Sequence, residues 1–349
     1  MSFEAALEPP RAHGAPLSSG RLRAQPEDFL VEEHLGFAPA GVGPHVLLKV
    51  RKRDANTQWV ARQLASLCRC RPADIGYAGL KDRHAVAVQW FTVPQSHLPP
   101  EEWVRVRSGE FQVLEAHRHA RKLPRGALAG NGFVIRVRGV EVEDARLCDR
   151  LEAIGTRGVP SYFGPQRFGR DAANLKRVSG ERRALAPPER GFVLSAARSL
   201  LFNAVLAERV AEETWDRLEP GDLAGLDGRG SHFPVEAVDD GLAARCARLE
   251  IHPTGPLWGS GSPPSAGRVL ELERRVAAGF PAACELIGAA GMRQERRSLR
   301  LAVRDLRWRR DPEAGECVIL EFRLSRGAYA TAVLRELFTL EDAYAESST

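Results

Sequence analysis

Hydrophobic and polar residues recur along the chain with two different periods, which together predict a mixed α and β protein. A period of two is typical of a strand, and a spacing of three and four residues is typical of a helix. The first pattern predicts strands at residues 45–50, 86–93, 111–116, 133–140, 299–306 and 317–324. The second predicts helices at residues 57–67, 144–154, 196–213, 267–278 and 329–338.

The predicted strands are distributed unevenly. They cluster before residue 140 and after residue 298, whereas the middle of the chain is helical with loops rich in glycine and proline, such as residues 252–267. This distribution predicts an α+β fold with a discontinuous sheet domain, residues 1–154 and 301–349, interrupted by an inserted domain, residues 155–300. The insert lies within the usual size range of a domain.

Composition narrows the class of protein. The chain has 349 residues, of which 44% are hydrophobic and 27% charged, which is enough apolar material for a large core. No apolar run approaches the roughly 18 to 20 residues that a bilayer span needs. The N-terminus lacks a cationic segment followed by an apolar stretch, so we expect no signal peptide and a cytoplasmic location.

The cysteines argue against a metal site. Of six cysteines only Cys68 and Cys70 are close together, and they have no second pair of ligands to close a tetrahedron. The pair His117 and His119 has no acidic or cysteine partner nearby. We therefore expect reduced cysteines and no bound metal.

Charge points to a nucleic acid. The net charge is +5, but residues 51–138 hold 16 Lys and Arg against 7 Asp and Glu, a net charge of +9. A cationic region on a nearly balanced protein attracts a phosphate backbone. Nucleic acid is therefore the expected partner.

The densest local signal is GYAGLKDRHAVAVQWFTV, residues 76–93. Two glycines predict a tight turn, and Asp82 stands between Lys81 and Arg83 where a strand begins. The flanking cations favour the ionised carboxylate and also suit a phosphate. A charged turn is equally typical of a solvated loop.

A second segment, RHARKLPRGALAGNGFVIRVRG, joins a basic loop to a strand at residues 118–139. Asn131 and Phe133 flank Gly132 at the strand entry, where an amide can read a base edge and a ring can stack on it. The plainer interpretation is a turn asparagine and a core phenylalanine.

Several long segments stand out along the chain: GLKDRHAVAVQ, KLPRGALAGNGF, GVPSYFGPQRFGR, LSAARSLLFNAVLAERV, RQERRSLRL and GAYATAVLREL. They resemble successive signatures of one family, the TruD-type tRNA pseudouridine synthases. They occur in that family's order, and the match runs from about Gln25 to Phe338. Within the family picture the core is a mixed sheet flanked by helices, and the α/β insert is family-specific.

The resemblance implies an isomerase that converts uridine to pseudouridine in tRNA, typically uridine 13 of the D arm, without a cofactor. It implies that Asp82 is the catalytic aspartate. It places Phe29, Asn131, Phe133 and Tyr329 around a flipped uracil. Arg23 stands where the family commonly has lysine, and Lys81 is expected to contact phosphate or to orient Asp82. We expect the protein to be a monomer.

Three alternatives stay open at this point. Asp82 can act as a nucleophile on C1′ or C6, or it can abstract the ribose C2′ proton. A non-catalytic RNA-binding or chaperone protein would retain the same cationic surface. A glycoside or nucleoside hydrolase would use the same carboxylate, although it usually needs a second one nearby.

Overall fold

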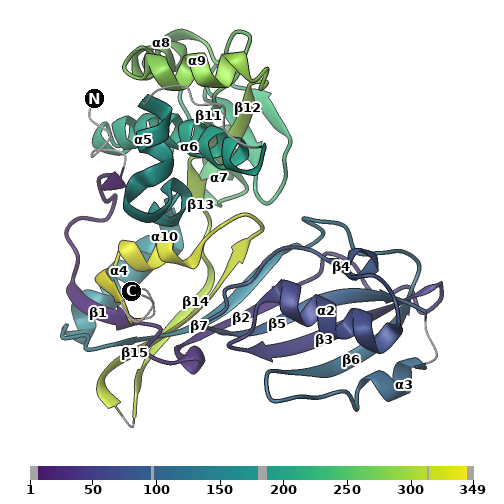
Figure 1. Ribbon diagram of the computed structural model, residues 1–349. Coiled ribbons are helices and arrows are strands. Elements are labelled where there is room, and N and C mark those ends of the chain that lie inside the picture. The colour runs from purple at the N-terminus through teal and green to yellow at the C-terminus, as the bar shows by residue number, and fades with distance from the viewer. Residues whose placement is uncertain (1–6, 96–97, 180–186, 313, 344–349) are drawn as a thin grey trace. The chain divides into compact units, whose positions relative to one another are not determined.

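The computed structural model describes residues 7–95, 98–179, 187–312 and 314–343. Within those limits the chain divides into two compact units, each assembled from stretches that are far apart in the sequence (Figure 1). The sheet unit contains residues 17–144, 304–327 and 338–343. The helical unit contains residues 7–16, 145–303 and 328–337.

The sheet unit is built on one mixed sheet with the order β14-β15-β7-β2-β5-β3-β6, to which β1, β4 and β16 add at the sides. The pairs β1–β16 and β2–β5 are parallel, and the other pairs are antiparallel. Its strands are β1 (Ser18–Leu22), β2 (Phe29–His34), β3 (His45–Arg53), β4 (Gly76–Tyr77), β5 (Val86–Pro94), β6 (Phe111–His119), β7 (Gly130–Arg138), β14 (Arg304–Asp311), β15 (Ala314–Ser325) and β16 (Phe338–Asp342). Its helices are α2 (Thr57–Cys68) and α3 (Pro100–Trp103), with short 3₁₀ turns at Pro26–Asp28 and Pro72–Asp74.

Helix α2 lies across β3 and β5, as Figure 1 shows. The helix and the two strands present apolar side chains to one another there. Val46, Leu48 and Val50 alternate along β3 and point to one side of the sheet. Val60 and Leu64 lie four residues apart on α2 and are fully buried against them. This packing gives β3 a buried side on which the site described below depends.

The helical unit surrounds a long central helix, α6, and also contains a small sheet. That sheet has the order β10-β9-β11-β12, and β13 pairs with β8 separately. The helices are α4 (Asp144–Arg157), α5 (Ala173–Ser179), α6 (Pro187–Ala211), α7 (Asp240–Ala247), α8 (Gly267–Ala278), α9 (Pro281–Ala289) and α10 (Ala330–Arg335), with 3₁₀ turns at Pro165–Phe168 and Arg170–Ala172. The strands are β8 (Val159–Pro160), β9 (Leu223–Leu226), β10 (His232–Pro234), β11 (Ile251–Leu257), β12 (Glu295–Ser298) and β13 (Arg300–Leu301).

Helix α6 forms the core of the helical unit. Leu200, Phe202 and Leu206 are fully buried and pack with Val276 and Ile287 of α8 and α9. In the described chain, residues Glu189–Ala211 are long and apolar enough to cross a bilayer by length and composition, but 67% of their most apolar stretch is buried inside the protein. Such burial is typical of a core helix, which passes the same test.

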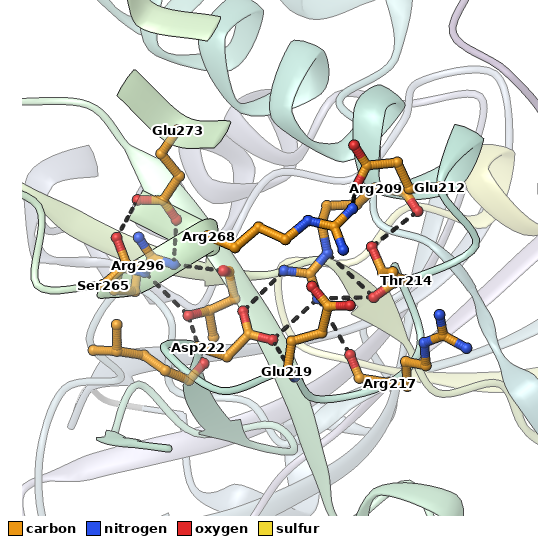
Figure 2. Close-up of polar contacts among 12 residues, drawn as sticks. Arg209, Glu212, Thr214, Arg217, Glu219, Asp222, Ser265, Arg268, Glu273 and Arg296 are labelled. Carbon is orange, nitrogen blue, oxygen red and sulfur yellow. Dashed lines mark hydrogen bonds and ion pairs between the residues drawn. The ribbon is translucent and has the colours of Figure 1, made fainter. Parts of the chain in front are cut away.

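Buried ion pairs hold the helical unit together (Figure 2). The Arg209 guanidinium donates to both carboxylate oxygens of Asp222 at 3.0 Å and to the carbonyl oxygen of Thr214 at 2.8 Å. Arg296 pairs with Glu273 at 2.8 Å, and Ser265 donates to the same carboxylate at 2.6 Å. Each of these buried charges therefore meets an opposite charge directly.

The α+β fold predicted from the sequence is confirmed, although three details are wrong. Residues 252–257 lie in β11 and not in a loop, although this stretch contains two prolines and a glycine. The strand predicted at 299–306 is two strands, β13 and β14, in different units. Of the helix predicted at 329–338, only Ala330–Arg335 is helical, as α10, and Phe338 already begins β16. The domain limits at residues 155 and 300 stay a prediction.

Candidate active site

Asp82 lies on the short loop between β4 and β5 in the sheet unit. Gly76 in β4 lies so close to Thr92 and to the backbone of Leu123 that a side chain at this position would clash. The close approach holds β4 against β5 and so fixes where the loop starts. At the far end of the turn, the Asp82 side chain is 50% exposed. The structure thus presents a carboxylate to solvent where an apolar strand begins.

A buried cation faces this carboxylate. Nη1 of Arg23 lies 3.6 Å from Oδ2 of Asp82, and the Arg23 side chain is only 7% exposed. Arg23 is held from its other side by Asp342, whose Oδ1 accepts from Nε at 3.3 Å and whose Oδ2 pairs with Nη2. Its backbone has a φ of 58°, an uncommon conformation for an arginine. Arg23 therefore links two carboxylates that are far apart in the sequence.

Strand register brings the predicted aromatic and amide residues to the same side of the sheet. In the β2–β7 pair, Phe29 lies opposite Ile135, and Asn131 lies opposite Glu33. Because side chains alternate along a strand, Phe29, Asn131 and Phe133 share one face. The Arg23 guanidinium stacks over the Phe29 ring at 5.5 Å, which connects this face to Asp82.

The rings of Phe29 and Phe133 contact each other directly. Phe29 and Phe133 meet edge to face, with centroids 6.1 Å apart and an interplanar angle of 75°, so no planar base fits between them. Phe133 also stacks on Phe322 at 5.4 Å. A base can stack only on a face that these contacts leave open.

Asn131 has an unusual environment. It is only 8% exposed, and its Oδ1 is buried with no hydrogen-bond partner in the described part of the chain. Buried polar atoms are nearly always paired, so an unpaired acceptor needs an explanation. A donor supplied by a ligand is one.

Lys81 and Arg83 flank Asp82 but have different surroundings. The Lys81 ammonium pairs with Glu33 at 2.5 Å, and the two side chains are 10% and 0% exposed. This ion pair ties Lys81 to β2, and its expected role, to contact phosphate or to orient Asp82, stays a prediction. Arg83 is exposed to solvent.

The sequence did not indicate four buried polar residues around the loop: Glu33, Lys52, Thr57 and Gln89. Burial lowers the pKa of Lys52 to about 8, although the nearby Asp82 charge raises it. The sequence did contain a signal for Lys52, because this residue continues the buried alternation of Val46, Leu48 and Val50 along β3. A charged residue in the buried phase of a strand needs a specific partner.

Tyr329 lies in the helical unit, at the start of α10. Its side chain is exposed, and its hydroxyl accepts a hydrogen bond from Nη2 of Arg167 at 3.0 Å. Arg167 also lies over the Phe163 ring at 5.1 Å, and Arg297 lies over the same ring at 4.4 Å. Tyr329 thus belongs to a cluster of arginines and aromatic rings within its own unit.

A groove of about 790 Å³ also lies in the sheet unit, and Asp82 is not among its lining residues. Its lining includes Leu30, Glu32, Val88 and Val134, which have the opposite strand phase to Phe29 and Asn131, but Phe133 also borders it. Among the described residues, no group of three or more His, Cys, Asp and Glu side chains is arranged to hold a metal ion.

Comparison with known proteins shows which family this chain resembles. The family model of tRNA pseudouridine synthase D (TruD) matches residues 12–182 and 176–337. Proteins named tRNA pseudouridine synthase D are 46% identical in Nitrosococcus oceani and 45% identical in Methylococcus capsulatus, each match covering 94% of this chain and 93% of the relative. A crystal structure described as TruD from Methanosarcina mazei has a TM-score of 0.71 at 22% identity and covers 93% of this chain and 94% of that one, which shows the shared fold.

These findings define an RNA-modifying isomerase of the pseudouridine synthase class. The chain belongs to the tRNA pseudouridine synthase D (TruD) family. The resemblance found in the sequence is therefore confirmed, and the chain forms pseudouridine in tRNA.

Proposed function

We propose that the chain converts uridine 13 in the D arm of tRNA to pseudouridine, and that Asp82 is the catalytic carboxylate. The observation that carries this proposal is the environment of Asp82. Its side chain is half-exposed beside the buried Arg23 guanidinium, while its main chain is tied to buried groups. A carboxylate held in place by its backbone can meet a substrate without a conformational search.

The reaction rearranges the uridine without adding or removing atoms. The N1–C1′ bond breaks, the uracil rotates, and a C5–C1′ bond forms. The C5 hydrogen leaves as a proton, and N1 gains a proton. Asp82 serves this sequence either as a nucleophile or as the base that takes the C2′ proton, and both routes require its carboxylate.

Asn131 and the phenylalanines would hold the flipped base. The unpaired Oδ1 of Asn131 is an acceptor suited to the N3–H of uracil. Flipping a base costs a few kcal/mol, and stacking on an aromatic ring returns about 1 to 3 kcal/mol. Phe29 and Phe133 supply such rings on the same face of the sheet. A base bound here would satisfy Asn131 and stack at the same time.

Arg23 and Arg83 would complete the substrate contacts. Because Asp342 holds two of its nitrogens, Arg23 is oriented with Nη1 toward Asp82. The exposed Arg83 would contact a phosphate next to the flipped nucleotide. The predicted place of Tyr329 beside the flipped uracil stays a prediction, and so does the monomeric state.

Tritium release tests the reaction directly. The purified protein is incubated with tRNA labelled at uracil C5, and the products are digested and separated. We expect tritium in water and pseudouridine at position 13. Binding without release would leave only an RNA-binding function. Free uracil with abasic tRNA would indicate hydrolysis instead.

A further inference from the structure

Four buried side chains converge on the segment that carries Asp82. Three of the contacts are to its backbone: Gln89 Nε2 donates to the carbonyl oxygen of Gly79 at 2.6 Å, the amide of Lys81 donates to Oγ1 of Thr57 at 3.0 Å, and Lys52 Nζ donates to the carbonyl oxygen of Asp82 at 2.7 Å.

The fourth contact is the pair between Lys81 Nζ and Glu33 Oε1 at 2.5 Å. Glu33 uses its other oxygen to accept from the amide of Trp90 in β5 at 3.0 Å. Thr57 in turn donates to Oε1 of Gln89 at 3.0 Å. The side chains come from β2, β3, the start of α2 and β5, so the loop is tied to four separate elements of the sheet unit. We call Glu33, Lys52, Thr57 and Gln89 the cradle.

Burying these polar and charged side chains makes folding less favourable, so their presence needs an explanation. Each cradle residue is at most 2% exposed, and moving a polar or charged group out of water is unfavourable. Lys52 is the extreme case, because its hydrogen bonds go to two main-chain carbonyls, of Ala55 at 2.6 Å and of Asp82. A further valine or leucine would continue the apolar side of β3 without that cost.

We propose that the cradle positions the Asp82 carboxylate for the reaction, with Lys52 and Thr57 as positioning residues that touch the loop backbone and not the substrate. This inference rests on the proposed catalytic role of Asp82. Fixing residues 79–82 on four elements sets the direction of the Asp82 Cα–Cβ bond, while the side chain stays half-exposed. A displacement of about 1 Å at a reacting group can lower the rate by about 100-fold.

Thr57 gives the cleanest test, because valine has the shape of threonine without its hydroxyl. We expect Thr57→Val to lower kcat for pseudouridine formation by about 10-fold or more while the Kd for tRNA changes by less than about twofold. Thr57→Ser keeps the hydroxyl and should restore most of the rate. Thr214→Val is the matched control: Thr214 is buried in the helical unit, and its Oγ1 donates to the carbonyl oxygen of Arg209 at 3.4 Å, outside the sheet unit.

Lys52→Met is the second variant, because methionine fills similar space without the donor. We expect kcat to fall by about 10-fold to 100-fold with tRNA affinity nearly unchanged. A readout independent of activity is hydrogen exchange by mass spectrometry over residues 77–84, which should be faster in Thr57→Val and unchanged in Thr214→Val.

The outcomes separate the two proposals. If Asp82→Asn is inactive while Thr57→Val and Lys52→Met keep the wild-type kcat, the cradle proposal is overturned and the catalytic role of Asp82 stands. An equal loss in Thr57→Val and Thr214→Val overturns it too, since the effect is then one of general stability. A rise in Kd at constant kcat would show that Lys52 attracts RNA instead. An active Asp82→Asn refutes the proposed function itself.

Discussion

The sheet unit and the helical unit both bury charged side chains, but two of their buried networks end differently. In the helical unit Arg209 meets Asp222 and Arg296 meets Glu273, so these four charges are compensated inside the unit (Figure 2). In the sheet unit Lys52 donates to backbone carbonyls, one of which belongs to Asp82, whose own side chain is half-exposed. Buried charge alone therefore does not mark a functional site. What distinguishes the sheet unit is that its buried network ends on the backbone of a residue, Asp82, whose carboxylate is exposed.

Removing the exposed charge should produce the largest effect. For Asp82→Asn we expect kcat to fall by at least about 10³-fold, because no other group replaces the carboxylate. tRNA affinity should stay within about twofold, since phosphate contacts dominate binding. Single-turnover kinetics and a filter-binding assay measure the two quantities. A wild-type rate would mean that Asp82 is not the catalytic residue of the sheet unit.

Breaking a closed pair in the helical unit should affect stability instead. Arg209→Met leaves the Asp222 carboxylate buried and unpaired, which should lower the free energy of unfolding by about 3 to 5 kcal/mol. The double variant Arg209→Met with Asp222→Leu should recover part of that loss. Urea unfolding measures both. If Arg209→Met is as stable as the wild type, the pair of Arg209 with Asp222 does not stabilise the helical unit.

A change on the aromatic face should have an intermediate effect. Phe133→Leu keeps apolar volume next to Phe29 and Phe322 but removes the ring. We expect kcat to fall by about 10-fold, in line with the loss of one stacking contact. The control is Phe202→Leu in the core of the helical unit, which should leave kcat of the folded protein near the wild-type value. Equal kinetics for the two variants would argue against a base contact at Phe133.

The pH dependence of stability should show the smallest effect. The pKa of Lys52 is lowered from 10.5 to about 8 in the folded protein, so between these values the unfolded chain binds more protons. Unfolding free energy should therefore rise with pH in this window, by up to about 1.4 kcal/mol per pH unit. Lys52→Met lacks this contribution, so the difference between the two proteins should grow in favour of the wild type from pH 8 to pH 10. A constant difference in urea unfolding would contradict it.

The sequence predicted elements best where a single period was strong. Residues 267–278 form the predicted helix with the predicted limits, because its apolar positions follow helical spacing. β11 was missed because Pro253, Gly255 and Pro256 indicate a loop by themselves. Its pairing with β9 and β12 makes it a strand, and that pairing is not local information.

The site was predictable only in part, for a similar reason. Asp82 and Asn131 stand in motifs that a resemblance can locate. Glu33 and Lys52 belong to the cradle only because of strand register, which sets their side chains toward the same loop. A polar residue in the buried phase of a strand can be detected in a sequence, but its partner cannot.

The most direct measurement maps pseudouridine in tRNA from cells that lack this protein and from the same cells supplied with the wild type or Asp82→Asn. The account predicts that pseudouridine 13 disappears without the protein, returns with the wild type and stays absent with Asp82→Asn. Restoration of pseudouridine 13 by Asp82→Asn, at similar protein levels, would contradict the central claim.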